Sequence, residues 1–310
     1  MAVLSGADAQ DTGRPWQRER GFRMNGAAHD WQSSCAVSVV IPTLNEARNI
    51  GWVLARLPEC VDEVIVVDGR STDGTTDVVR AARPDAVIVA ETKRGKGAAI
   101  RAGFARARGE AVVMLDADGS MHPGEITRYV AALDEGYDLV KGSRFLDRGG
   151  TTDISPLRKL GNLALLTTTN LLYGSAFTEL CYGYIAVRRS AIPRLRLTAV
   201  GFEIEAQIVA HALRAGLEIT EVPSFEAERR FGDSNLRTFR DGGRVFWQLL
   251  CARARTWPNP VPELEGLATE PAHEPSALPV GSRLAHDHLW AAAAAPQLPP
   301  VMGDEACVTG

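Results

Sequence analysis

The stretch Val112-Val113-Met114-Leu115-Asp116-Ala117-Asp118-Gly119 decides the fold, because four apolar residues lead directly into two carboxylates one residue apart. The apolar half predicts a buried β-strand, and the acidic half predicts a polar loop at its carboxyl end. In open α/β sheets, ligands bind beyond the carboxyl ends of the strands. Since carboxylates are oxygen ligands, the loop is a candidate site for a divalent cation that carries substrate phosphates.

Apolar β-branched runs alternate with amphipathic helical segments on both sides of this stretch. The predicted strands are 37–41, 64–67, 86–90, 112–115 and 138–141, and the predicted helices are 49–57, 75–82, 97–108 and 125–133. Strands that are apolar throughout and separated by helices indicate a mostly parallel sheet covered on both faces. The sequence therefore predicts an α/β, Rossmann-like fold.

Composition and charge exclude several classes of protein. The net charge of -4 argues against a nucleic-acid-binding protein, which usually needs a basic surface. The five cysteines show no C-x-x-C spacing, so neither a disulfide framework nor a zinc site is indicated. We find no signal peptide and no apolar run long enough to span a bilayer. We therefore expect a cytoplasmic protein that is soluble or lies on a membrane surface.

We expect one folded domain over residues 35–256, between two disordered extensions. Residues 1–34 mix Gly, Asp, Arg and Gln without hydrophobic periodicity. Residues 257–310 are rich in Pro and Ala and contain nine of the seventeen prolines, a density that opposes regular helix over most of this tail.

Polar residues and glycines follow each of the first four predicted strands. These segments are 42–46, 68–74, 93–97 and 116–118. Because right-handed crossovers place the carboxyl ends of parallel strands along one edge, the four segments should meet there. Glycines, helix N-termini and the charge of Lys96 suit the phosphates of a nucleotide. A lone D-x-D is more often a polar turn, and Asp73 could be only a helix cap, but the convergence of four loops favours a binding site.

Several segments resemble one enzyme family. VSVVIPTLNEARNI (37–50), DEVIVVDGRSTDGTTDVV (62–79) and GKGAAIRAGFARARGEAVVMLDADGSMHP (95–123) resemble the nucleotide-binding half of family 2 glycosyltransferases, whose fold is GT-A. DLVKGSRF (138–145), TELCYGYIAVRR (178–189) and GFEIEAQIVAHALRAG (201–216) are similar to the dolichyl-phosphate mannose or polyprenyl-phosphate hexose synthase branch. The resemblance implies a single GT-A domain, with a nucleotide-sugar-binding half at 35–145 and an acceptor half at 146–256.

The resemblance also implies roles for the residues at the strand ends. The predicted nucleotide-sugar-binding residues are Pro42, Thr43, Asn45, Glu46, Asp68, Ser71, Asp73, Lys96, Asp116 and Ala117. Asp116, Asp118 and Ser120 are the predicted ligands of Mg²⁺ or Mn²⁺. A departing nucleoside diphosphate develops negative charge, and a carboxylate-bound divalent cation neutralises that charge without proton transfer.

On the acceptor side, the same branch implies that Arg144 and Arg158 approach the phosphate of a lipid acceptor, and we expect Arg229 to join them. Arginine suits a phosphate because its planar fork donates two parallel hydrogen bonds. The alternative for Arg158 is an ion pair at the surface.

Glu179 stands where the family usually has Asp, and we expect it to act with Asp118 and Arg144 in catalysis. A phosphate monoester acceptor has a second pKa of about 6, so it is largely ionised near neutral pH and needs no strong base. A hydroxyl acceptor would instead need Glu179, Glu203 or Glu205 as general base. Glu203 and Glu205 are two residues apart, so at most one of them should face the site.

A membrane contact is expected from the segment 236–255, which has the pattern of a helix with arginines beside aromatic and aliphatic residues. Such a helix suits a lipid headgroup layer, although its apolar face could equally dock on the protein.

The sequence thus predicts an inverting, metal-dependent hexosyltransferase that uses a nucleoside-diphosphate sugar, of the GDP-mannose or UDP-glucose type, and a polyprenyl phosphate. One alternative is the same donor chemistry on a soluble acceptor, either a small phosphorylated acid or a secondary-metabolite aglycone. Another is a nucleotide-sugar-binding protein without catalytic activity.

Overall fold

The computed structural model describes residues 35–232, 238–254 and 264, all of which fall within one compact unit of the chain. The predicted disordered extensions over 1–34 and 257–310 lie outside the described residues, with one exception. Leu264 is 2% exposed and packs in a hydrophobic cluster of the core. At least this residue of the predicted tail therefore belongs to the folded domain.

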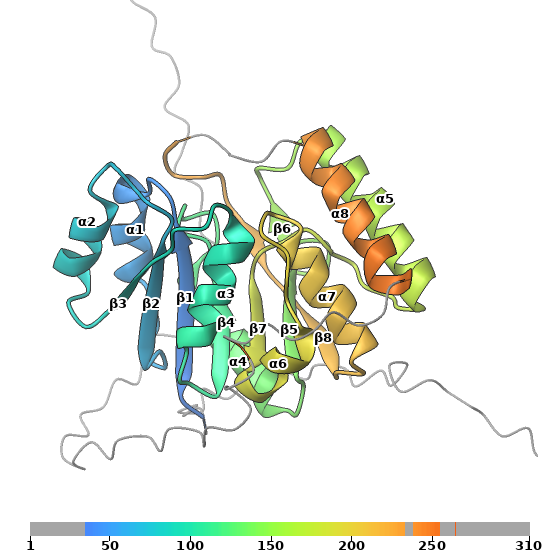
Figure 1. Cartoon of the computed structure of the whole chain (residues 1–310), viewed down its shortest axis with the longest axis horizontal. Coiled ribbons are helices and arrows are strands. Elements are labelled where there is room, and N and C mark those ends of the chain that lie inside the picture. Colours follow the sequence, from blue (N-terminus) through green and yellow to red (C-terminus); the bar gives the residue numbers. More distant parts are fainter. Residues whose placement is uncertain (1–34, 233–237, 255–263, 265–310) are drawn as a thin grey trace, which may run out of the picture. The chain divides into compact units, whose positions relative to one another are not determined.

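A seven-stranded sheet forms the centre of the domain, with the strand order β3-β2-β1-β4-β7-β5-β8 (Figure 1). Its strands are β1 (Val37–Thr43), β2 (Glu63–Asp68), β3 (Val87–Ala90), β4 (Ala111–Met114), β5 (Leu139–Ser143), β7 (Ile185–Arg188) and β8 (Ile219–Pro223). All neighbouring pairs are parallel except those of β7, which runs antiparallel to β4 and β5. The prediction of a mostly parallel sheet is confirmed. Separately, β6 (Gly150–Thr151) pairs with β9 (Phe225–Glu226).

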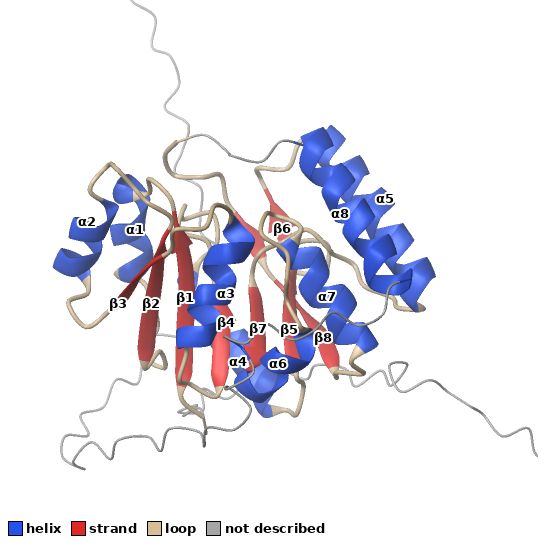
Figure 2. Ribbon diagram, viewed as in Figure 1, coloured by secondary structure: helices blue, strands red, loops and turns tan. Residues whose placement is uncertain are grey.

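Helices cover both faces of the sheet (Figure 2). They are α1 (Ala47–Leu54), α2 (Thr75–Ala82), α3 (Lys96–Arg106), α4 (Ile126–Asp134), α5 (Pro156–Tyr173), α6 (Ile192–Leu195), α7 (Ile204–Arg214) and α8 (Thr238–Ala254). One hydrophobic cluster joins α1, α2 and α4 to one face, and a second joins α3, α6 and α7 to the other. The helices α5 and α8 lie side by side and pack on α7 through a third cluster. Among the described helices, none combines the length and apolar character needed to cross a bilayer.

The alternation of side chains along β1 explains the two-faced core. Val37, Val39 and Ile41 pack in the first cluster, whereas Val40 packs in the second, because successive side chains of a strand point to opposite faces. Burial on both faces accounts for the uninterrupted apolar sequence of the central strands.

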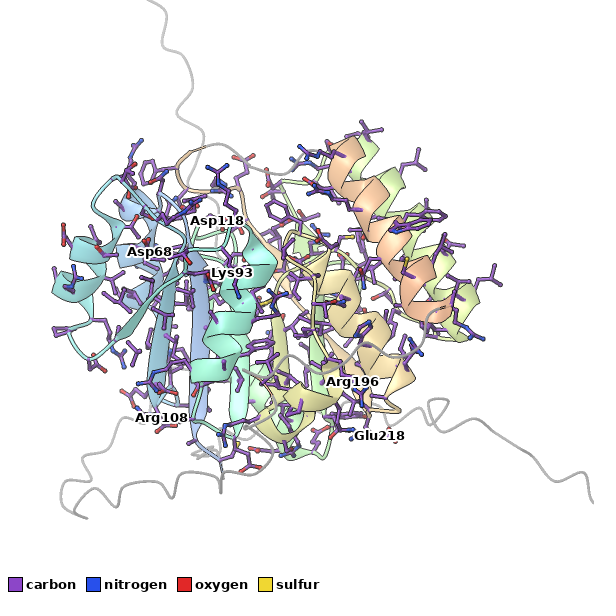
Figure 3. The ribbon with its side chains drawn as sticks, in the orientation of Figure 1. Asp68, Lys93, Arg108, Asp118, Arg196 and Glu218 are labelled. Carbon is purple, nitrogen blue, oxygen red and sulfur yellow. The ribbon has the colours of Figure 1, made fainter. Side chains whose placement is uncertain are left out.

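The register of the parallel strands places their carboxyl ends at one edge. Thr43 lies opposite Asp68, which in turn lies opposite Ala90 on β3. Figure 3 shows Asp68 and Asp118 at the same end of the sheet, with Arg108 at the opposite end. The predicted convergence of the strand ends is therefore confirmed, and the candidate site lies there.

Candidate active site

The loops after β1 and β2 are joined by hydrogen bonds around Asn45. The Asn45 N–H donates to Ser71 Oγ (2.8 Å), and Asn45 Oδ1 accepts from the N–H of Thr72 (2.9 Å). Asn45 has a φ of 58°, in the left-handed region that Asn tolerates better than most residues. Asn45 and Ser71 therefore fix the shape of this loop pair.

Asp68 is the last residue of β2, and only one of its two carboxylate oxygens is hydrogen-bonded within the described part of the chain. Oδ2 accepts from the backbone N–H groups of Arg70 (3.1 Å) and Ser71 (3.0 Å). Oδ1 is buried and has no hydrogen-bond partner among the described residues. A buried polar atom without a partner is costly, so this oxygen fits a hydrogen-bond donor on a bound molecule.

Asp73 accepts hydrogen bonds from backbone N–H groups at the starts of two helices. Its Oδ1 accepts from the N–H of Thr75 (3.0 Å), in the first turn of α2, and its Oδ2 accepts from the N–H of Ala47 (3.0 Å), where α1 begins. Thr43 is buried and donates to the carbonyl of Val67 (3.3 Å), and Pro42 is half-buried beside it. Nucleotide contacts of these residues stay predictions.

Lys96 lies between two carboxylates at the start of α3. Its Nζ is 2.7 Å from Asp116 Oδ1 and 2.7 Å from Glu205 Oε1. Burial lowers the pKa of Lys96, but the charges of Asp116 and Glu205 outweigh this effect and raise its pKa above the ordinary value. Lys96 is therefore a fixed cation at the strand edge.

The glycine before Lys96 allows this placement. Gly95 has a φ of 114°, and a Cβ atom built there would lie 2.1 Å from the carbonyl oxygen of Val200. Only glycine permits both this backbone conformation and this close approach. The approach brings the start of α3 against the segment that leads into α7, which carries Glu205.

Asp118 pairs with an arginine from a distant part of the chain. Its Oδ1 accepts from the N–H (2.9 Å) and the hydroxyl (2.7 Å) of Ser120, and its Oδ2 is 2.9 Å from Arg229 Nη2. Arg229 Nη1 is also 3.0 Å from Glu46 Oε1. Arg229, predicted to bind the acceptor phosphate, thus lies against the donor-side carboxylates. Ala117, between the two aspartates, packs its methyl group in the core.

The side chains of Asp116, Asp118 and Ser120 fit a magnesium-type or manganese-type cation. Burial raises the pKa of Asp116 to about 6, with Lys96 lowering it and the nearby charges of Asp118 and Glu205 raising it further. A divalent cation would relieve this excess of negative charge, and the donors are oxygens of the kind that it prefers. The described residues contain no cluster of three His, Cys, Asp or Glu side chains arranged to hold a metal. A cation bound by Asp116 and Asp118 would therefore also need the Ser120 hydroxyl and oxygen ligands from a substrate or water.

A cavity of about 220 Å³ opens between this edge and the helix pair α5 and α8. Its polar and charged lining includes Lys96, Asp116, Asp118, Ser120, Arg144, Asp153, Arg158, Asn162, Glu205, Glu226, Arg229 and Asp241. The lining also includes the apolar side chains of Met121, Ile154, Leu165, Phe202 and Val245 and the glycines Gly161 and Gly242. The cavity therefore offers both charged and apolar side chains to a ligand.

Arg144 lines the cavity above a fully buried carboxylate. Its Nε is 2.8 Å from Glu179 Oε2, and its Nη1 is 2.8 Å from Glu226 Oε2. Glu179 Oε1 accepts from the N–H groups of Leu180 and Cys181 (2.9 and 3.1 Å). Glu179 is 0% exposed and does not line the cavity, so it holds the guanidinium of Arg144 in place.

Arg158, in contrast, lines the cavity without forming an ion pair with any described residue. The surface ion pair weighed as an alternative is thus absent from the described part of the chain. Of the two glutamates near α7, only Glu205 lines the cavity, whereas Glu203 Oε1 accepts from the N–H groups of Val200 (3.3 Å) and Gly201 (3.0 Å).

A second buried layer supports Glu179. Glu221 on β8 accepts hydrogen bonds from the N–H of Thr178 (2.8 Å) and of Glu179 (3.0 Å). Lys141 on β5 is 0% exposed and donates to the carbonyl of Tyr182 (2.8 Å), and burial lowers its pKa. Burial raises the pKa of Glu221 to about 7, although the hydrogen bonds from Thr178 and the charge of Lys141 act against this rise.

The raised pKa of Glu221 predicts a pH dependence of stability. Between its ordinary value of 4.5 and about 7, the folded protein holds a proton that the unfolded chain releases. The free energy of unfolding should therefore fall as the pH rises through this window, by at most about 1.4 kcal/mol per pH unit. Urea unfolding at several pH values would measure this slope.

The variant Glu221→Gln should lose this part of the slope. Glu218→Gln is a matched control, because Glu218 precedes the same strand and is exposed. An unchanged slope in Glu221→Gln would show that Glu221 is already ionised at pH 5 in the folded protein.

The cavity is also lined by residues outside the predicted site, among them Glu226, Phe202 and Glu205. Glu226 is on the two-residue strand β9, and Phe202 precedes α7, so neither stands in a sequence pattern that marks a binding site. Glu205 was named from the sequence only as one possible general base for a hydroxyl acceptor. Its pairing with Lys96 spans 109 residues of sequence, and no local pattern predicts such a contact.

Comparisons with known proteins agree with this geometry. Residues 38–196 match the family model described as glycosyl transferase family 2. The chain is 35% identical over 225 residues to glycosyltransferase AglJ of Haloferax volcanii, covering 71% of this chain and 73% of that protein. It is 36% identical over 236 residues to polyprenol monophosphomannose synthase of Mycolicibacterium smegmatis, covering 72% and 88%.

A similar solved structure is that of glucosyl-3-phosphoglycerate synthase from Mycobacterium tuberculosis, in complex with Mn²⁺, uridine diphosphate and glucosyl-3-phosphoglycerate. It is 26% identical, with a TM-score of 0.55, and the match covers 71% of this chain and 78% of that one. The fold is thus GT-A, as predicted. The chain belongs to glycosyl transferase family 2 and is a glycosyltransferase of the polyprenyl-phosphate hexose synthase branch.

Proposed function

We propose that the protein transfers a hexose from a nucleoside-diphosphate sugar to a polyprenyl phosphate, with inversion at the transferred carbon and with Mg²⁺ or Mn²⁺ bound at Asp116, Asp118 and Ser120. The mixed lining of the cavity is the observation that supports this proposal most directly. A polyprenyl phosphate has a charged head and a hydrocarbon chain, and the cavity is lined by arginines and also by apolar side chains, among them Leu165 of α5 and Val245 of α8.

The donor side of the proposal rests on the strand edge. The unpartnered oxygen of Asp68 suits a donor group of the nucleoside, and Lys96 supplies a fixed positive charge beside the predicted metal ligands. When bound, the cation supplies charge that neutralises the departing diphosphate. The complex of the structural neighbour with Mn²⁺ and uridine diphosphate supports this choice of donor and metal.

The acceptor side rests on Arg158 and on the state of the nearby glutamates. Arg158 faces the cavity and is free of ion pairs with described residues, so its guanidinium is available to a phosphate. Glu179 and Glu205 each form an ion pair with a neighbouring cation, Arg144 or Lys96, so neither carboxylate is free to accept the proton of an acceptor hydroxyl. A phosphate nucleophile needs no such base.

A soluble acceptor is the second candidate, and the structural neighbour favours it because that enzyme was solved with glucosyl-3-phosphoglycerate. Such a small phosphorylated acid would use the arginines of the cavity in the same way. It would leave the apolar side chains of the cavity, among them Ile154, Leu165 and Val245, without a ligand group to contact.

A transfer assay with purified protein tests the two candidates. UDP-glucose and GDP-mannose would each be offered with undecaprenyl phosphate in detergent or with 3-phosphoglycerate, in the presence of Mg²⁺, Mn²⁺ or EDTA. We expect a glycolipid product that disappears with EDTA. Transfer to 3-phosphoglycerate alone would support the soluble-acceptor candidate and refute the lipid one.

We also propose that α5 and α8 contact the cytoplasmic membrane face. Four leucines of α5 and two aromatic residues of α8 are exposed: Leu157, Leu160, Leu163, Leu171, Phe246 and Trp247. Arg240 and Arg244 of α8 are also exposed, and they line a shallow hollow together with Trp247. The opposite side of α8, with Val245 and Leu249, packs on the protein. Apolar and basic side chains on one surface suit an anionic lipid layer.

Cosedimentation with vesicles that contain anionic lipid tests this contact. The protein should pellet with the vesicles at low salt and less so at high salt. Trp247→Ser should weaken binding about tenfold, because a large apolar side chain no longer enters the lipid. Leu44→Ser is a matched control, since Leu44 is 47% exposed but lies in the loop after β1. Equal binding by all three proteins would contradict the proposed surface.

A further inference from the structure

Two glycines face the cavity from the two neighbouring helices. Gly161 lies in α5 and Gly242 in α8, and both line the cavity. A Cβ atom built at either position has no atom within 4 Å apart from its chain neighbours and the backbone of its own helix. Glycine inside a helix lowers helix stability relative to alanine. The fold therefore retains glycine at two helical positions where a larger side chain would meet no protein atom.

Other helical glycines of this protein have a packing reason that these two lack. At Gly103 of α3, a Cβ atom would lie 2.2 Å from Val40 Cγ1, so the contact of α3 with the sheet requires glycine. Neither Gly161 nor Gly242 has a positive φ, and no described backbone or side chain approaches them. Gly161 is exposed and Gly242 is half-buried, and both border the cavity.

The position of the glycines relates them to the acceptor. Gly161 follows Arg158 by three residues, so the two positions share one face of α5. Further along the helix pair, Leu166 of α5 and Leu249 of α8 pack in the same buried cluster and close the space between the helices. A molecule whose phosphate binds Arg158 would thus place its next carbons beside the glycines, before the closed part of the interface.

We infer that Gly161 and Gly242 determine acceptor specificity, because they leave room for the isoprene units next to the acceptor phosphate. This inference rests on the proposed transfer to polyprenyl phosphate. The methyl-branched chain is wider than the phosphate oxygen that links it, and the absence of side chains on both walls provides that width. Larger residues at these positions would fill the space without disturbing the protein around it.

Gly243 provides a matched control in the same helix. A Cβ atom at Gly243 also has no atom within 4 Å, but Gly243 lines a different hollow, together with Glu203, Arg240 and Trp247. A side chain at Gly243 therefore has the same effect on helix formation and none on the cavity that holds the predicted site.

The experiment compares Gly161→Leu, Gly242→Leu and Gly243→Leu in the full chain. Leucine is a good helix former, so all three should fold, which thermal unfolding would verify. We expect kcat/KM for undecaprenyl phosphate to fall at least about tenfold in the first two variants and to stay unchanged in the third. Binding of the nucleotide sugar should be unchanged in all three. Gly242→Ala, with a smaller side chain, should show an intermediate loss and covers the case in which a leucine variant fails to fold.

The outcomes separate the inference from the proposed function. Wild-type transfer to undecaprenyl phosphate, with no loss in Gly242→Leu or Gly161→Leu relative to Gly243→Leu, would overturn the inference alone. Equal losses of nucleotide-sugar binding would also overturn it, since the variants would then act on the donor. A wild-type protein that never uses undecaprenyl phosphate would overturn the proposed function and the inference with it.

Discussion

Replacing Asp118 with alanine is expected to lower kcat about a thousandfold, because the departing diphosphate would lose part of its electrostatic stabilisation. The fold should survive this change. Arg229, the partner of Asp118, keeps its ion pair with Glu46 at 3.0 Å, so no buried charge is left alone. Transfer assays at saturating donor and acceptor would measure the loss.

Thermal unfolding gives a readout of Asp118 that does not depend on turnover. A ligand at a hundred times its dissociation constant adds about 2.7 kcal/mol to the free energy of unfolding. With a nucleotide sugar and Mn²⁺, the wild-type protein should show this gain, and Asp118→Ala should lose the part that depends on the metal. Asp77→Ala is the control, since the Asp77 side chain is 80% exposed and its ion pair is with Arg80 on the surface of α2. An unchanged metal-dependent gain in Asp118→Ala would remove Asp118 from the ligand set.

Replacing Arg144 with methionine is expected to destabilise the protein by about 3 to 5 kcal/mol, because it leaves a buried carboxylate without its cation. Glu179 is 0% exposed and lies 2.8 Å from the guanidinium, so water cannot replace the lost partner. Acceptor use should also fall, since Arg144 lines the cavity. Urea unfolding would measure the destabilisation.

A double-mutant cycle tests the cause of this loss. In Arg144→Met/Glu179→Gln the carboxylate charge is also removed, so the double variant should be more stable than Arg144→Met alone. The amide oxygen of the substituted side chain could still accept from the two backbone N–H groups that Glu179 binds. If the two variants unfold at the same urea concentration, the burial of an unpaired charge is not what destabilises Arg144→Met.

Sequence patterns predicted the donor half of the fold well, because its strands are apolar on both faces and its helices are amphipathic. The predicted helix over 75–82 has the same bounds as α2. The strand β7 was missed. It has only four residues, and its antiparallel pairing with β4 and β5 depends on partners that are distant in sequence. The strands β8 and β9 were also missed, and their partners β5 and β6 are likewise distant in sequence.

Part of the candidate site was also predicted from the sequence, and part of it was not. The rule that strand ends converge brought Lys96, Asp116 and Asp118 together, and the structure confirms that they meet. The ion pairs of Glu205 and Glu226 depend on how α7 and β9 pack against the edge, which no local pattern encodes. The individual roles of Pro42, Thr43, Glu46 and the other predicted contacts stay predictions, and their test is the binding of donor by single variants.

The bridge that Arg229 forms between Asp118 and Glu46 has a consequence for how the two substrates bind. Anything that binds Asp118 Oδ2 competes with the guanidinium, so donor loading and the release of Arg229 are thermodynamically linked, each favouring the other. A released guanidinium, still attached beside the cavity, would then be available to a second anion. Because such coupling is reciprocal, each substrate should raise the affinity of the enzyme for the other by the same factor.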